Sequence, residues 1–117
     1  MSTRLHVESK HIVEYSDFSA FKYNIVEFQQ LLMCLEVELT CELGDHTFEV
    51  SSYEFDNAIY LLENHKMDND KEYVTIVNKI YNNDSSISDK TDILVAIFNN
   101  YKKCADTNDG YLHFEYF

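Results

Sequence analysis

The chain of 117 residues contains no proline and only two glycines, and it has no repeat or low-complexity block. A linker is therefore not evident, and we expect one compact domain spanning residues 1–117. No apolar run approaches the roughly 18 residues needed to span a bilayer, so we expect no membrane segment. The first ten residues, MSTRLHVESK, lack the apolar stretch of a signal peptide, which predicts a cytoplasmic protein.

Chemistry-bearing motifs are also scarce. Cys34, Cys41 and Cys104 are widely spaced, and no CxxC pair exists for a zinc or thioredoxin-type site. Phosphate-binding glycine loops and a serine-nucleophile elbow are absent. Two aspartate-rich stretches, at 68–72 and 106–110, lack glycine where a calcium loop needs it. The sequence therefore predicts a protein that is not an enzyme and holds no cofactor.

The strongest pattern that is present is an alternation in residues 35–50, LEVELTCELGDHTFEV. Apolar and polar residues alternate strictly, as in a half-buried strand. Gly44-Asp45 fits a two-residue turn with glycine first. Folded about that turn, Cys41 faces Phe48 and Thr40 faces Glu49, so apolar pairs with apolar and polar with polar. The pattern predicts a β-hairpin over 35–50.

Helical and strand periods account for most of the remaining chain. An apolar stripe from about Phe18 to Leu32 predicts one helix, and Ser51 with Glu54 has the capping-box spacing that opens a second. Further helices are expected over residues 71–82 and from about residue 88. Short strands are expected at the two ends, in RLHVES and in GYLHFEYF. The fold class predicted is α+β, with a small antiparallel or mixed sheet whose one face is covered by about four helices.

Charge is strongly one-sided, with 21 acidic against 9 basic residues and a formal net charge of -12. Such a field repels nucleic acid and anionic membranes and attracts basic partners. The predicted hairpin concentrates carboxylates on the outer side, where like charges on neighbouring positions destabilise a sheet. Arg4 and Lys10 are the near cations in sequence, and neither lies on the hairpin. The alternatives are a solvated sheet face and a docking surface for a basic partner. The candidate partner-binding residues are Glu36, Glu38, Glu42, Glu49, Tyr111 and Glu115.

Two further features bear on function. Tyr60, Tyr111 and Phe117 fall off the apolar stripes, and exposed aromatic residues flanked by acids can anchor a protein interface. His6-Val7-Glu8 and His113-Phe114-Glu115 each place a histidine and a glutamate on one strand face. If those strands were adjacent, the four groups could bind a divalent metal, in a small metal-dependent enzyme or sensor.

In its small size, acidity, scarcity of glycine and charged sheet face, the chain resembles bacterial toxin-immunity proteins of contact-dependent inhibition and other polymorphic toxin systems. The resemblance implies a cytoplasmic, non-enzymatic inhibitor that binds a basic, nuclease-type toxin and occludes its active site. Phage or viral inhibitors that mimic the charge of nucleic acid share the same general character. The basic toxin is thus the expected partner, and nucleic acid and membrane are not.

Overall fold

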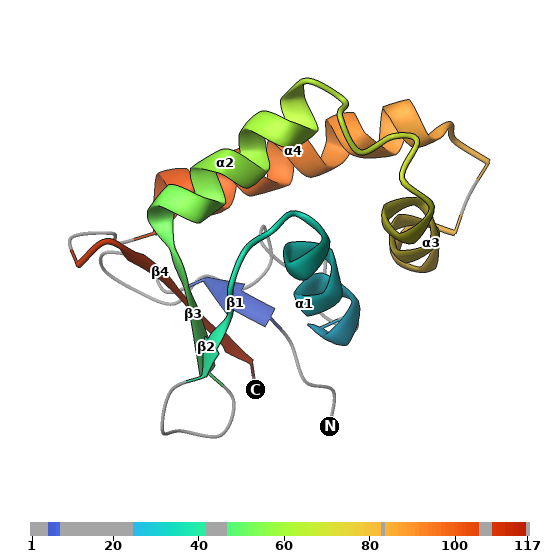
Figure 1. Ribbon diagram of the computed structural model, residues 1–117. Helices are drawn as coiled ribbons and strands as arrows, with labels where there is room; N and C mark the ends of the chain where they lie inside the picture. The colour runs from blue at the N-terminus through green and yellow to red at the C-terminus, as the bar shows by residue number, and fades with distance from the viewer. Residues whose placement is uncertain (1–4, 8–24, 42–46, 83, 106–108, 117) are drawn as a thin grey trace.

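A computed structural model describes residues 5–7, 25–41, 47–82, 84–105 and 109–116. These residues form an α+β fold in which a four-stranded antiparallel sheet lies beneath helices (Figure 1). The strands are β1 (Leu5–Val7), β2 (Thr40–Cys41), β3 (Thr47–Ser51) and β4 (Tyr111–Tyr116). The helices are α1 (Ile25–Cys34), α2 (Ser52–Glu63), α3 (Lys71–Ile80) and α4 (Ile87–Cys104).

The spatial order of the sheet is β1-β4-β3-β2, so β4 lies between the first strand and the hairpin. Leu5 pairs with Tyr116 at one side of β4, and Phe48 pairs with Phe114 at the other. The predicted hairpin register is confirmed, because Thr40 lies opposite Glu49 and Cys41 opposite Phe48. The predicted turn at Gly44-Asp45 lies outside the described residues.

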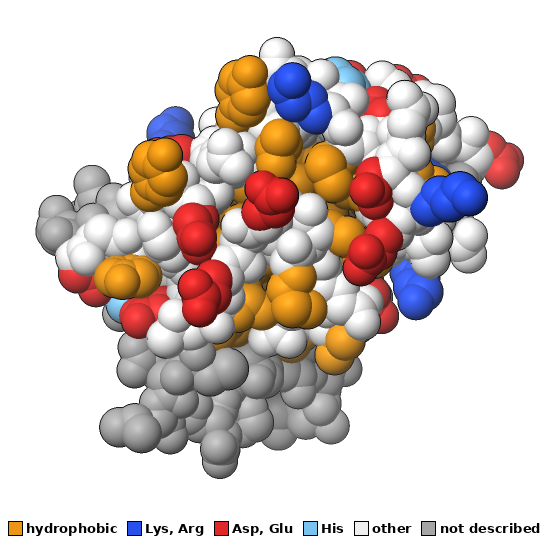
Figure 2. Space-filling model, in the orientation of Figure 1, with side chains coloured by type: hydrophobic (Ala, Val, Ile, Leu, Met, Phe, Trp, Pro, Cys, Tyr) orange, Lys and Arg blue, Asp and Glu red, His pale blue; other side chains and the backbone are white. Residues whose placement is uncertain are grey.

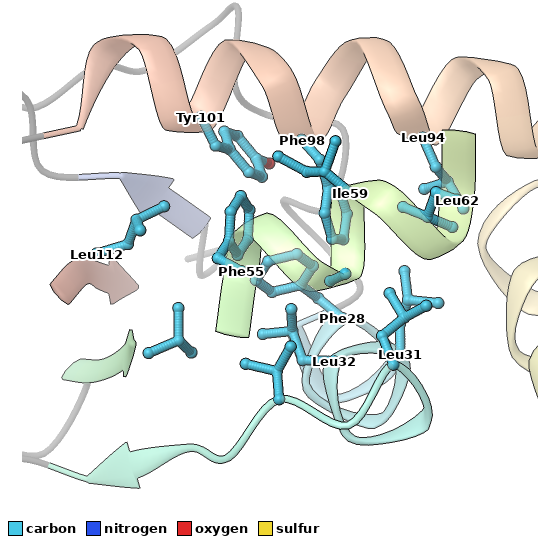
Figure 3. Packing of buried hydrophobic residues seen from close by; sticks show 14 of the residues in the cluster. Phe28, Leu31, Leu32, Phe55, Ile59, Leu62, Leu94, Phe98, Tyr101 and Leu112 are labelled. Atoms are coloured by element: carbon cyan, nitrogen blue, oxygen red, sulfur yellow. The ribbon is translucent and has the colours of Figure 1, made fainter. Parts of the chain in front are cut away.

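The hydrophobic core lies between the sheet and helices α1, α2 and α4, and buried residues of α3 extend it. Aromatic rings from the sheet and from α1, α2 and α4 meet around two rings, Phe28 of α1 and Phe114 of β4. The centroid of Phe114 lies 5.1 Å from that of Phe48 in a stacked arrangement and 5.3 Å from that of Phe28 in an edge arrangement. Figure 3 shows Phe28 pointing into the same space as Phe55 and Tyr101. The sheet face that bears Phe48 and Phe114 is therefore sealed by helices, as predicted.

The prediction of a strand from Leu35 to Leu43 is wrong over residues 35–39. Helix α1 continues to Cys34 and ends in a Schellman motif, in which Glu36 has φ 63°. Glu36 N–H donates to Met33 O at 3.0 Å, and Val37 N–H donates to Leu32 O at 2.9 Å. This motif buries Leu35 and Val37 and exposes Glu36, so it produces the same alternation as a strand.

The expected start of α1 near Phe18 lies outside the described residues, and the other helix predictions hold with small shifts at their ends. Ser51 caps α2, and its hydroxyl accepts the N–H of Glu54 at 3.4 Å. Asp70 caps α3, which ends at Ile80 rather than at residue 82, and Ser86 caps α4. Helix α3 packs against α1 and α4 and lies at the end of the molecule away from the strands (Figure 1).

We predict that Phe114→Ala lowers the free energy of unfolding by about 3–5 kcal/mol, because it removes a ring packed against four others. Urea unfolding followed by circular dichroism measures the loss. Tyr53→Ala is the control, since this ring is 82% exposed and its removal should change stability by about 0.5 kcal/mol or less. Equal losses in the two variants would contradict the assigned core.

A second prediction concerns Glu36, a residue with a side chain in the left-handed region that glycine adopts without strain. Glu36→Gly should be more stable than Glu36→Ala by about 0.5–1 kcal/mol, because both variants remove the charge and only glycine removes the strain. Thermal unfolding of the two variants tests this. A Glu36→Ala variant as stable as Glu36→Gly would mean that the helix does not end in this motif.

Candidate functional site

The predicted carboxylates do not form one continuous sheet face. Glu36 lies in the turn after α1, and Glu38 lies in the extended segment before β2. Glu49 lies in β3, and Glu115 lies in β4 between His6 of β1 and Thr47 of β3. Glu42 lies outside the described residues. The expectation that these glutamates share the outer side of the hairpin is therefore wrong for Glu36 and Glu38, since strand pairing in the described part begins at Thr40.

Two of the predicted residues nevertheless meet at a groove, which we call the acidic groove. It has a volume of about 280 Å³ and lies where the segment before β2, the end of β3 and the start of α2 come together. Glu38 lines the groove from the segment before β2, and Tyr111 lines it from β4. The lining residues are Glu38, Thr40, Ser51, Tyr53, Glu54 and Tyr111.

The cap of α2 positions this groove. Ser51 is the last residue of β3 and pairs with Tyr111, so α2 begins directly beside β4. Ser52 N–H also donates to Gly110 O at 2.8 Å. The carboxylate of Glu54 was expected within a capping box; its Oε1 accepts the backbone N–H of Glu38 at 3.0 Å. That bond holds the segment before β2 against the first turn of α2.

The side chains of the groove are mostly accessible to a partner. Tyr53 is 82% exposed and Tyr111 is 40% exposed, and Glu38 is also exposed. Within the described part of the chain, the carboxylate of Glu38 has no ion-pair partner. Figure 2 shows carboxylates and hydrophobic side chains interspersed across this face, with lysines toward its edges. A site with this lining can accept a cationic side chain and hold it against an aromatic ring.

Sequence reasoning missed Tyr53 and the second role of Glu54. The signal for Tyr53 was present, because it falls off the stripe of Phe55, Ile59 and Leu62 on which α2 is buried. The contact between Glu54 and Glu38 joins residues 16 apart in the sequence. The end of α1 lies just before Glu38, and the alternation of apolar and polar residues had suggested a strand there instead. No sequence pattern in the segment reveals that contact.

Glu49 differs from the other candidates because its carboxylate contacts a histidine of the neighbouring strand. Its Oε2 lies 3.1 Å from Nδ1 of His113, the residue opposite it on β4, and only 15% of the Glu49 side chain is exposed. The other ring nitrogen of His113 lies 2.7 Å from Oδ2 of Asp109. The hydrogen bond from His113, aided by the N–H of Tyr111, lowers the pKa of Asp109. The Glu49 carboxylate is therefore already engaged in a contact within the chain.

A second histidine is held by two carboxylates at the other end of the molecule. Nδ1 of His65 lies 2.7 Å from Oδ2 of Asp68, and its Nε2 lies 3.0 Å from Oδ1 of Asp92 on α4. The hydrogen bond to Asp68, assisted by the charges of Asp68 and Asp92, raises the pKa of His65 above its ordinary value. His65 has φ 52° and ends α2 in a second Schellman motif.

The Asp68 carboxylate extends this network into the core. Its Oδ1 accepts the hydroxyl of Thr91 at 2.8 Å, and the Thr91 oxygen lies 2.7 Å from the hydroxyl of Tyr73. Because the Thr91 hydroxyl donates to Asp68, the Tyr73 hydroxyl must donate to Thr91. Thr91 and Tyr73 are fully buried, so this series of hydrogen bonds ties α3 to α4 and to the loop after α2. Its position on three elements indicates a structural role.

The metal hypothesis depended on adjacency of the terminal strands. That condition is met in part, since β1 pairs with β4 and His6 lies opposite Glu115. Glu8 lies outside the described residues, and both nitrogens of His113 already contact carboxylates. Among the residues that the structure describes, no three His, Cys, Asp or Glu side chains are grouped so as to hold a metal ion.

Comparisons of the chain with protein-family models, with curated proteins and with solved structures found no match. A search of the described helices for a membrane span found none with the necessary length and apolar character.

The His65 network predicts a specific pH dependence. Because folding raises the pKa of His65, its stabilising contribution is complete below about pH 6.5 and is lost as pH rises through the folded-state pKa. We expect the stability advantage of the wild type over His65→Gln to shrink between about pH 5 and about pH 9. Urea unfolding at each pH measures it.

The control variant for this measurement is Asn57→Gln, an exposed change on α2 that carries no titrating group. Its effect on stability should be the same at every pH. A His65→Gln effect that is equally independent of pH would contradict the ion pairs assigned to His65.

Proposed function

We propose that this chain is a non-enzymatic acidic binding protein of the toxin-immunity type, which neutralises a basic, nuclease-type toxin by covering its active site. The observation that carries the proposal is the acidic groove, where Glu38 and Glu54 lie with the exposed rings of Tyr53 and Tyr111. It gathers two candidates from the sequence, Glu38 and Tyr111, in one place on the surface.

A nuclease holds its substrate through lysine and arginine side chains that contact phosphates. The acidic groove presents two carboxylates and two tyrosine rings to such a side chain. A guanidinium can form paired hydrogen bonds with a carboxylate and stack on a tyrosine ring at the same time. One inserted arginine would thus satisfy both kinds of group that line the groove.

Charge and aromatic contacts would act on different steps of binding. The net charge of -12 speeds the encounter with a basic partner, and this effect weakens as salt is added. Rings that become buried on binding slow dissociation instead. Tyr60, exposed on α2 beyond Tyr53, extends the aromatic surface along the helix, with the ammonium of Lys66 5.9 Å from its ring centroid.

Glu36 also supports a binding role. A glutamate occupies a left-handed position that glycine would fill with less strain, so folding stability does not account for its presence. Strained residues that persist in native proteins gather at functional sites. Glu36 lies two residues before Glu38, and we include it in the proposed surface together with Glu42, Glu49 and Glu115.

An inhibitor that mimics nucleic acid is the second candidate, because the same surface would meet the same kind of basic groove. The two hypotheses differ in the protein that is inhibited, a toxin in one case and a host nucleic-acid-binding protein in the other. Inhibition assays with both classes of protein distinguish them.

We predict that Glu38→Lys/Glu54→Gln weakens inhibition of a basic nuclease toxin by at least about tenfold, the equivalent of about 1.4 kcal/mol. Glutamine at 54 retains an acceptor for the N–H of Glu38, so the groove keeps its shape. The assay uses purified nuclease domains of contact-dependent-inhibition toxins and follows hydrolysis of labelled RNA or DNA.

The control is Asp84→Lys/Glu63→Gln, which makes the same charge change at exposed positions outside the groove. This variant should inhibit within about threefold of the wild type at physiological salt, since exposed charges beyond a Debye length are largely screened. The proposal fails if the groove variant and its control are equally active, or if the wild type inhibits none of these nucleases.

A further inference from the structure

A second, larger groove lies between α1 and α3, and we call it the α1–α3 groove. Its volume of about 530 Å³ falls within the range of ligand-binding clefts. α1 supplies Gln30 and Met33 on one wall. α3 supplies the other wall with five residues: Lys71, Glu72, Thr75, Ile76 and Lys79.

The α1 wall of this groove exposes aliphatic side chains to solvent. Met33 is 58% exposed, and Val26, on the same face of α1, is 61% exposed. With Gln30 they occur at spacings of four and three residues, which places them in one stripe along the helix. This stripe is distinct in kind from the acidic groove, where the exposed large side chains are tyrosines.

The α3 wall carries lysines at both ends of the groove. Lys71 and Lys79 are eight residues apart, which is about 12 Å along a helix. Within the described residues, neither ammonium forms an ion pair. Other lysines are engaged: Lys102 pairs with Asp56, and buried Lys90 donates to Asn78. The groove therefore holds two cations available to a partner in a chain with few of them.

Two acidic residues lie near these lysines, and they differ in their contacts. Asp70 Oδ1 accepts the N–H of Tyr73 at 2.9 Å as the cap of α3, so this carboxylate is engaged within the molecule. Glu72 is exposed and lines the groove itself. With Lys71, Lys79 and Glu72 in its lining, the groove still carries a formal charge of one positive unit.

We propose that the α1–α3 groove binds an acidic amphipathic helix from a partner protein. Its apolar residues would lie along Val26 and Met33, and carboxylates about two turns apart would pair with Lys71 and Lys79. An apolar stripe flanked by cations matches the way amphipathic helices enter grooves, with anchors at spacings of three, four and seven residues. The proposal is independent of the acidic groove, which is lined by other residues and bears the opposite charge.

The test uses a synthetic helical peptide of about fifteen residues with leucines on one face and glutamates flanking them. Fluorescence anisotropy of the labelled peptide against the full chain should show saturable binding in the micromolar range. Lys71→Glu/Lys79→Glu should weaken binding at least tenfold, and Met33→Ser should weaken it several-fold. The matched control Lys66→Glu/Lys103→Glu, outside the groove, should change it less than threefold.

Three outcomes would overturn the proposal. The first is absence of saturable binding by the wild type. The second is equal binding of a peptide in which glutamine replaces every glutamate, because that would remove the role of the lysines. The third is a wild-type dimer in sedimentation experiments that Met33→Ser dissociates, because the occupant would then be a second copy of this chain.

Discussion

The stacking of Phe114 on Phe48, and the contact of both rings with Phe28, is the interaction on which the rest of the structure depends. It joins the central strand to its neighbour and both to α1. The sheet is small, and its hairpin edge contains only Thr40 and Cys41 in the described part. Such a sheet has little stability without a covering layer. The aromatic cluster supplies that layer by bringing α2 and α4 onto the same face.

The scarcity of glycine shapes the ends of α1 and α2. Both helices end in Schellman motifs, where glycine is the usual residue, yet this chain places Glu36 and His65 there. At His65 the cost is offset by hydrogen bonds to two carboxylates. At Glu36 the described residues show no comparable side-chain contact. His65 is thus held by contacts within the molecule, whereas the strain at Glu36 is not offset by its side chain within the described residues.

Much of the fold could be predicted from the sequence because local rules and burial agreed. The register of Thr40 with Glu49, the cap at Ser51 and the strand Tyr111–Tyr116 follow from pattern alone. The segment from Leu35 to Leu39 could not be predicted, because a helix end without glycine gives the same alternation as a strand. Only part of the candidate site could be predicted. Glu38 and Tyr111 stood out by type, whereas their meeting with Tyr53 and Glu54 depends on tertiary packing.

The two grooves divide the surface by chemistry. Tyrosines and carboxylates line one, and aliphatic side chains, two lysines and one glutamate line the other. Under the two proposals the partners would be selected by charge as well as by shape, since a basic segment is disfavoured at the lysines and an acidic one at the acidic groove.

The central place of β4 has a consequence for how the molecule is assembled. Its pairing with β1 joins residues near opposite ends of the described chain, and such distant contacts form slowly because a long loop must close first. The acidic groove needs β4 as well, since Tyr111 lines it and Gly110 accepts the N–H of Ser52. A chain whose helices have formed but whose sheet is incomplete therefore lacks the acidic groove. A partner that binds this groove, as proposed, would select chains whose sheet is complete.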